Sequence, residues 1–137
     1  MNKLIRWIPA AIWILVIYYL SSQTGDHLNA LLPFFRKWLP FISGFNWAHF
    51  AAYFILALTF YWGLGSGYSN IKGKIIVVVL CLFFGITDEY HQSFVEGRLS
   101  DVMDLRNDTI GAALAMLLFS LPSVHRLYLK MPDSKKY

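Results

Sequence analysis

Charged residues are scarce in this chain. Asp, Glu, Lys and Arg make up 15% of its 137 residues, whereas hydrophobic residues make up 57% and the mean hydropathy is +0.48. Water-soluble domains usually carry about 25% charged residues. The composition therefore speaks against an ordinary soluble domain. It predicts one integral membrane domain over residues 1–137, with no separate soluble part.

Cysteine and recognisable catalytic motifs are also lacking. Cys81 is the one cysteine and lies in an apolar run, so no internal disulfide can form. The sequence has no nucleophile motif, phosphate-binding loop or HExxH pattern, which leaves any reaction class open. The net charge is +4, but no basic cluster is interleaved with exposed aromatic residues. Nucleic acid is therefore not an expected partner.

Four long apolar stretches are what the chain does contain. A membrane-crossing helix needs about 20 mainly apolar residues. Stretches 4–20, 47–64, 71–87 and 102–121 approach that length and predict an all-α polytopic membrane protein with four transmembrane helices. Pro122 is expected to end the fourth helix, leaving residues 122–137 as a tail. A cleaved signal peptide is the alternative for the first stretch, but SSQTGDH lacks a small-x-small cleavage site.

The basic residues predict the orientation. With the N-terminus inside, the inner segments hold 8 of the 12 lysines and arginines, in line with the positive-inside rule. The expected protein is thus a multi-pass protein of the cell membrane with both termini, and the tail, in the cytoplasm. Its long outer loop, 21–46, contains an apolar segment interrupted by Pro33 and Pro40. This segment predicts an interfacial or re-entrant element.

Polar residues gather at the outer ends of all four predicted helices. Ionisable groups in membrane helices are costly and usually face the bundle interior, which makes them candidates for function. We therefore expect one outward-facing pocket. Its candidate ligand-binding residues are Gln23, His49, Tyr53, Asp88, Glu89, His91, Gln92, Arg98, Asp104 and Asp108.

Asp88 and Glu89 are the most informative of these residues. The C-terminal end of a helix disfavours anions, so both carboxylates require a cation, a metal or a proton. We expect Arg98 to pair with Glu89. Each pair of carboxylates also has a purely structural alternative. Asp88 and Glu89 would form an ion pair with an arginine, and Asp104 and Asp108 would stabilise the N-terminus of the fourth helix. In the fourth helix, Gly111 and Ala115 predict close helix packing.

Four motifs resemble the VanZ-like family: SSQ, HFAAY, DEYHQSFVEGR and DLRNDTIGAALA. The resemblance covers about residues 21–118 and is most specific over 88–111. Glu96 departs from it, since the family usually has proline there, and Phe45–Asn46 stands where an Asp-Lys pair is common. The resemblance implies a small polytopic membrane protein of Gram-positive-type envelopes. The founding member of the family is linked to resistance to the glycopeptide teicoplanin, so the resemblance implies a contribution to resistance as one expectation and gives no reaction.

Three functions follow from these patterns. The first is binding of an envelope lipid or a lipid-linked cell-wall component, with Arg98 contacting phosphate or carboxylate. The second is a membrane-embedded, metal-dependent enzyme acting on an envelope lipid or cell-wall precursor, with catalytic candidates Glu89, His91 and Asp104. A divalent Mg²⁺, Mn²⁺ or Zn²⁺ would then have the candidate ligands His49, Glu89, Asp104 and Asp108. Ion-coupled transport ranks last, because the predicted helix interiors carry few ionisable residues. Membrane lipids are expected partners, and no particular oligomeric state is indicated.

Overall fold

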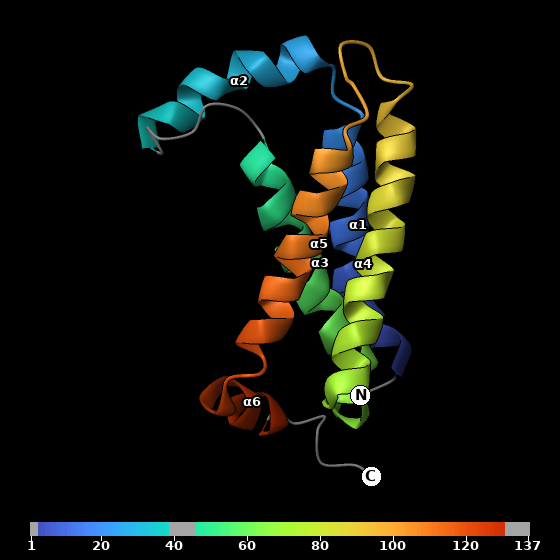
Figure 1. The fold of residues 1–137 in the computed structure, drawn as a ribbon, viewed down its shortest axis with the longest axis vertical. Coiled ribbons are helices and arrows are strands. Elements are labelled where there is room, and N and C mark those ends of the chain that lie inside the picture. Colours follow the sequence, from blue (N-terminus) through green and yellow to red (C-terminus); the bar gives the residue numbers. More distant parts are fainter. Residues whose placement is uncertain (1–2, 39–45, 131–137) are drawn as a thin grey trace.

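The computed structural model describes residues 3–38 and 46–130, and that part of the chain is mainly helical with no strand. Four helices run side by side along the long axis of the molecule: α1 (Ile8–Ser21), α3 (Asn46–Leu64), α4 (Ile71–Gln92) and α5 (Val102–Leu118). Across one end lies α2 (Gly25–Trp38), and across the other lies α6 (Pro122–Leu129) (Figure 1). Two short 3-10 helices, η1 (Lys3–Trp7) and η2 (Ser66–Tyr68), lie at the α6 end.

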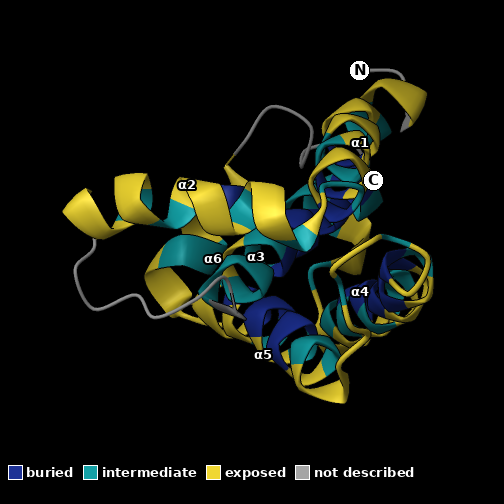
Figure 2. Cartoon of the chain, turned by 90° about the horizontal axis from the view of Figure 1, so that it is seen from above, coloured by how far each residue is buried: buried dark blue, intermediate teal, exposed yellow. Residues whose placement is uncertain are grey.

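The core of the bundle forms around α3. This helix contacts α1, α4 and α5, and its buried residues include Tyr53, Leu56 and Tyr61. Dark, buried positions face inward in the view from above, whereas the outward faces are exposed (Figure 2). Many of these exposed positions hold large apolar side chains, such as Leu15 and Phe83. An apolar outer surface of this kind suits lipid rather than water as the surrounding solvent.

Close contact between α3 and α5 depends on Gly111. A Cβ atom built on this glycine would lie 2.4 Å from the backbone oxygen of Phe50, which is too close for a real side chain. One turn further along α5, Ala115 is fully buried. The structure therefore confirms the close packing predicted from these two small residues.

The number of membrane spans is smaller than expected when judged by length and composition alone. Two stretches are long and apolar enough to cross a membrane, Leu4–Ser21 and Trp47–Leu64. The bent pair of α5 and α6 would make a third if it were one span. Charged residues lie within both remaining bundle helices, for example Lys74 in α4 and Asp104 in α5. Four transmembrane helices are thus not confirmed.

Pro122 does not act as the simple terminator that the sequence predicted. The last bundle helix already ends at Leu118, and Pro122 begins α6, which is bent by 78° from α5. Proline is well suited to a first helical position, because its missing N–H would have no partner there. Part of the expected tail, 122–137, is therefore helical. Residues 131–137 lie outside the described part.

Pro33 does not interrupt the outer loop either. It lies inside α2, where it removes the backbone N–H that would bond the Asn29 carbonyl. Asn29 is exposed, so solvent can satisfy that carbonyl. The helix α2 lies across the end of the bundle, in the segment for which the sequence predicted an interfacial or re-entrant element (Figure 1). Pro40 lies outside the described residues.

Candidate functional site

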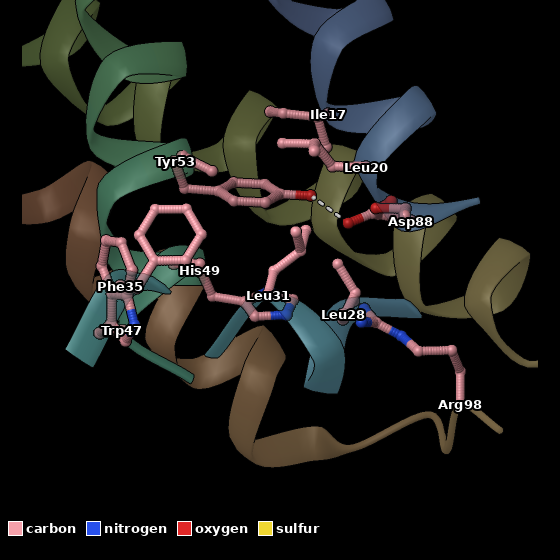
Figure 3. Close-up of a pocket in the computed structure, with 13 residues that line it drawn as sticks. Ile17, Leu20, Leu28, Leu31, Phe35, Trp47, His49, Tyr53, Asp88 and Arg98 are labelled. Carbon is pink, nitrogen blue, oxygen red and sulfur yellow. Dashed lines mark hydrogen bonds between the residues drawn. The ribbon is translucent and has the colours of Figure 1, made fainter. Parts of the chain in front are cut away.

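A cavity of about 230 Å³ lies between α2 and the bundle. Its apolar lining comes from α1, α2 and the start of α3, and consists of Ile17, Leu20, Leu28, Leu31, Phe35, Trp47, Ala48 and Ala52. The spacing of Leu28, Leu31 and Phe35 puts one face of α2 over the cavity. Polar side chains complete the lining: Ser21, His49, Tyr53, Asp88 and Arg98 (Figure 3). The cavity thus combines apolar walls with one group of polar residues.

Asp88 is the centre of a hydrogen-bonded group that we call the cavity network. Its Oδ2 accepts from the Tyr53 hydroxyl at 3.4 Å and from Gln92 Nε2 at 3.1 Å. Gln92 Nε2 also lies 3.4 Å from Ser21 Oγ, and Arg98 donates to Gln92 Oε1 from Nε at 3.1 Å and from Nη2. Asp88 and Gln92 are both buried, so these bonds replace the water that the two side chains lose.

The expected pairing of Arg98 with Glu89 is wrong. Arg98 bonds the neutral side chain of Gln92, and among the described residues no ion pair joins it to Glu89. Glu89 Oε2 accepts instead from the backbone N–H of Asp101 at 2.8 Å. The reason is helical geometry. Gln92 lies on the Asp88 face of α4, whereas Glu89 is turned about 100° away, toward the start of α5.

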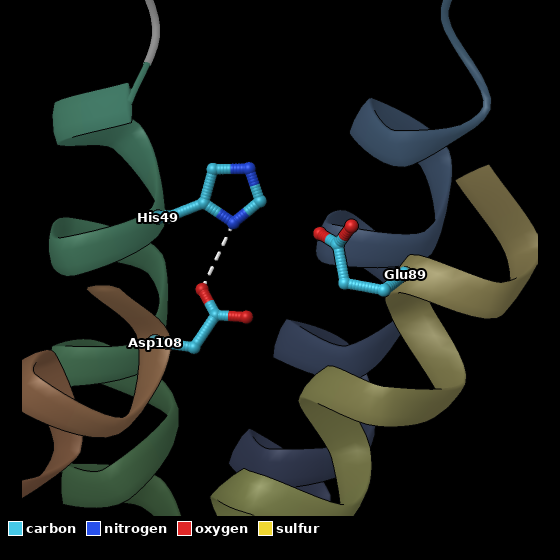
Figure 4. A group of neighbouring side chains, drawn as sticks. All are labelled: His49, Glu89 and Asp108. Carbon is cyan, nitrogen blue, oxygen red and sulfur yellow. Dashed lines mark hydrogen bonds and ion pairs between the residues drawn. The ribbon is translucent and has the colours of Figure 1, made fainter. Parts of the chain in front are cut away.

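A second group, which we call the acid–histidine cluster, joins α3, α4 and α5. It consists of His49, Glu89, Asp104 and Asp108. His49 Nδ1 lies 2.9 Å from Asp108 Oδ1, and His49 Nε2 lies 3.5 Å from Asp104 Oδ2. Ligand atoms of His49, Glu89 and Asp108 lie within 4.8 Å of one another (Figure 4). Three carboxyl groups therefore meet one imidazole in a largely buried space.

Gln23 and His91 do not join either group. Gln23 bonds its own helix end, donating to Tyr19 O at 3.0 Å, and its Oε1 lies 2.8 Å from His27 Nδ1. His91 stacks on Tyr18 with ring centroids 4.5 Å apart. His91 lies two residues beyond Glu89 in α4, and a helix turns through about 200° over two residues, which directs His91 to another side. Gln23 lies beyond the end of α1 at Ser21, where the chain has already left the helix.

Several residues that shape the site were not predicted. Asp101 caps α5 by accepting from Met103 N at 2.8 Å, while its own backbone N–H bonds Glu89. Its position just before an apolar helix is a recognisable capping signal. Gly85 leaves space beside the cluster, because a Cβ there would lie 3.0 Å from Asp108 Oδ2. The apolar cavity lining had no distinguishing signal beyond the spacing of Leu28, Leu31 and Phe35.

Comparison with known proteins assigns a family to this arrangement. The VanZ/LLP1 family model matches residues 6–123, which include the cavity lining, the cavity network and the acid–histidine cluster. The chain belongs to the VanZ/LLP1 family. The resemblance predicted from the motifs is therefore confirmed. Membership in the VanZ/LLP1 family and the apolar helices both fit a membrane protein.

A fungal protein is among the relatives of this VanZ/LLP1 family member. It is the uncharacterized protein C11E3.10 of Schizosaccharomyces pombe, 34% identical over 80 residues. The aligned part makes up 58% of this chain and 48% of the fungal protein, so the chain spans about half the length of this curated relative. No solved structure matches the chain.

Proposed function

We propose that this VanZ/LLP1 protein binds an anionic membrane lipid, with part of one hydrocarbon chain in the cavity under α2. The observation that carries the proposal is the cavity itself, which has apolar walls and the side chains of Arg98 and His49 in its lining. Its volume, about 230 Å³, is below the range of about 300–1,000 Å³ typical of sites for whole small molecules. A segment of a lipid chain suits that size, while the rest of the lipid remains in the bilayer.

The polar residues favour an anionic head group. Arg98 uses its Nε and Nη2 on Gln92, and a guanidinium has five N–H donors in all, so donors remain for a phosphate. The buried indole Nε1 of Trp47, another lining residue, has no hydrogen-bond partner among the described residues. Both groups are donors, but they lie on opposite sides of the cavity (Figure 3), so we assign the phosphate to Arg98. Its remaining donors support a phosphate-bearing lipid as the ligand.

The membrane arrangement belongs to the same proposal. All four bundle helices would cross the membrane, with α2 on the outer surface and both termini in the cytoplasm. The placement of basic residues supports this, because Arg6, Lys72, Lys74 and Arg126 belong to elements at the α6 end of the bundle. In this orientation the cavity opens on the outer leaflet, beside the interfacial helix α2.

Cysteine labelling tests this orientation. Ser100 and Ser123 are exposed at opposite ends of the bundle, and the native Cys81 is buried and shielded from reagents. In intact cells we expect a membrane-impermeant maleimide to label Ser100→Cys readily and Ser123→Cys only after lysis. The wild-type protein serves as the unlabelled control. Ready labelling at position 123 with none at position 100 would reverse the proposed topology.

Lipid binding is tested by photocrosslinking from two neighbouring positions of α2. Phe35 lines the cavity, whereas Phe34 is 65% exposed. A photoreactive phenylalanine analogue at position 35 should capture lipids enriched in phosphate-bearing species relative to the bulk membrane. The same analogue at position 34 should capture lipids in bulk proportions. Identical lipid composition at both positions would contradict the proposal.

Resistance to teicoplanin, which the sequence resemblance implied, stays a prediction. It would follow if the bound lipid were a cell-wall precursor. The relative in a yeast favours a ligand chemistry that is not confined to bacterial envelopes. The ligand is therefore defined here by its chemistry, a phosphate head group on a hydrocarbon chain.

A further inference from the structure

Three carboxyl oxygens in the acid–histidine cluster are buried and have no hydrogen-bond partner among the described residues: Glu89 Oε1, Asp104 Oδ1 and Asp108 Oδ2. Glu89 is 6% exposed and Asp108 is fully buried. Burying an oxygen of a charged group without a partner is among the costliest arrangements in a folded protein. The carboxyl group of Glu89 points toward the space beside His49 and Asp108 (Figure 4). The cluster therefore contains buried acceptor oxygens with no partner among the described residues, and the Glu89 carboxyl is turned toward the other members.

The negative charge of this cluster is not balanced by the basic residues next to it in the sequence. Arg98 bonds Gln92, and Arg106 bonds Asn107 Oδ1 at 3.4 Å. Among the described residues, His49 is the one basic partner in the ion pairs of the cluster. One imidazolium can neutralise one of three carboxylates. A further cation would offset the remaining charge and occupy the unused oxygens.

From these observations we propose that His49, Glu89 and Asp108 bind one divalent transition-metal cation, with Asp104 as a fourth ligand or as a hydrogen-bond partner of His49. One nitrogen and carboxylate oxygens form a ligand set suited to Zn²⁺ or Mn²⁺, and the imidazole disfavours Mg²⁺ and Ca²⁺. Ligand atoms around a tetrahedral ion at about 2.0 Å lie roughly 3.3 Å apart. The present spread of 4.8 Å means that the three side chains would move closer on binding.

Gly85 keeps a side chain of α4 away from the cluster. A side chain at this position of α4 would meet Leu105 Cδ1 at 2.9 Å and Asp108 Oδ2 at 3.0 Å. Because glycine lacks that side chain, the unpartnered oxygen of Asp108 faces the α4 backbone without a clash. His49 also lines the lipid cavity. If the proposed lipid binding holds, the ion would lie at the polar end of that cavity, where a phosphate oxygen could complete its coordination.

Metal content of delipidated protein tests this site separately from lipid binding. The full chain is purified in detergent and treated with a chelator. It is then equilibrated with Zn²⁺ or Mn²⁺ at micromolar free concentration, and its bound metal is measured by elemental mass spectrometry. We expect about one equivalent in the wild type and at least tenfold less in Glu89→Gln and Asp108→Asn. Glu96→Gln is the matched control, since Glu96 is exposed in the following loop, and it should retain the wild-type amount.

The wild-type measurement decides the proposal even if a variant does not fold. A wild-type protein that binds neither metal under these conditions would overturn it. Equal metal content in Asp108→Asn and Glu96→Gln would overturn it as well. His49→Gln, which keeps a polar side chain at position 49, gives a further check and should also lose the ion. Photocrosslinking at position 35 reports on the lipid without reference to the metal, so failure of one proposal is distinguishable from failure of the other.

Discussion

Replacing Gly111 with alanine should destabilise the protein by ~3 kcal/mol or more, the upper part of the range for overpacked cores. The added Cβ would lie 2.4 Å from Phe50 O and 3.1 Å from Phe50 C. Backbone atoms of a packed helix cannot rotate away as the end of a long side chain can, so α3 and α5 would have to separate. Thermal denaturation of the purified protein in detergent measures this loss of stability.

Separation of these helices should also disturb the acid–histidine cluster. His49 precedes Phe50 on α3, and Asp108 lies one turn before Gly111 on α5, so the 2.9 Å contact between His49 and Asp108 crosses the same interface. Gly111→Ala should therefore lower metal content along with stability. The two effects have one physical cause, an increased distance between α3 and α5.

Gly67 provides the matched control for this substitution. A Cβ built on Gly67 meets no atom within 4 Å, and its backbone is not in the left-handed region. Gly67→Ala should therefore change stability by no more than about 0.5 kcal/mol. A Gly111→Ala protein as stable as Gly67→Ala would contradict the described approach of α3 and α5.

The sequence was informative where polar residues interrupt apolar helices. His49, Asp88, Asp104 and Asp108 each stand near the end of a mainly apolar stretch, and their cost in such surroundings implied that they face one another. The structure brings them together at one end of the bundle. The direction of individual side chains was harder to predict. Ser21 and Gln23 look equivalent in a sequence, but they lie on different sides of the chain as it leaves α1.

Apolar features of the site could not be predicted with the same success. Ile17, Leu31 and Ala52 line the cavity, yet each resembles any other apolar residue in a membrane helix. Their role depends on how α2 packs across the bundle, which involves contacts between segments far apart in the chain. The effects of the prolines on the helices were predicted wrongly for a related reason. Pro33 is tolerated inside an exposed helix, and Pro122 begins α6 after α5 has already ended at Leu118.

Filling the cavity should abolish lipid retention with little effect on the rest of the bundle. Ala52 lines the cavity, and the neighbouring Ala51 is exposed on another face of α3. An Ala52→Trp indole would occupy space that we assign to the lipid chain. The same indole in Ala51→Trp would face outward. The contact of Trp13 Nε1 with Ala52 O, at 2.8 Å, uses a backbone atom that both variants keep. Thermal denaturation in detergent verifies that both variants fold.

The amount of phosphate-bearing lipid that co-purifies with each protein, measured by mass spectrometry, tests the central claim most directly. We expect about one equivalent of an anionic lipid with the wild type and with Ala51→Trp, and at least tenfold less with a folded Ala52→Trp protein. Equal amounts of bound anionic lipid in Ala51→Trp and a folded Ala52→Trp would contradict the assignment of the cavity as a lipid site.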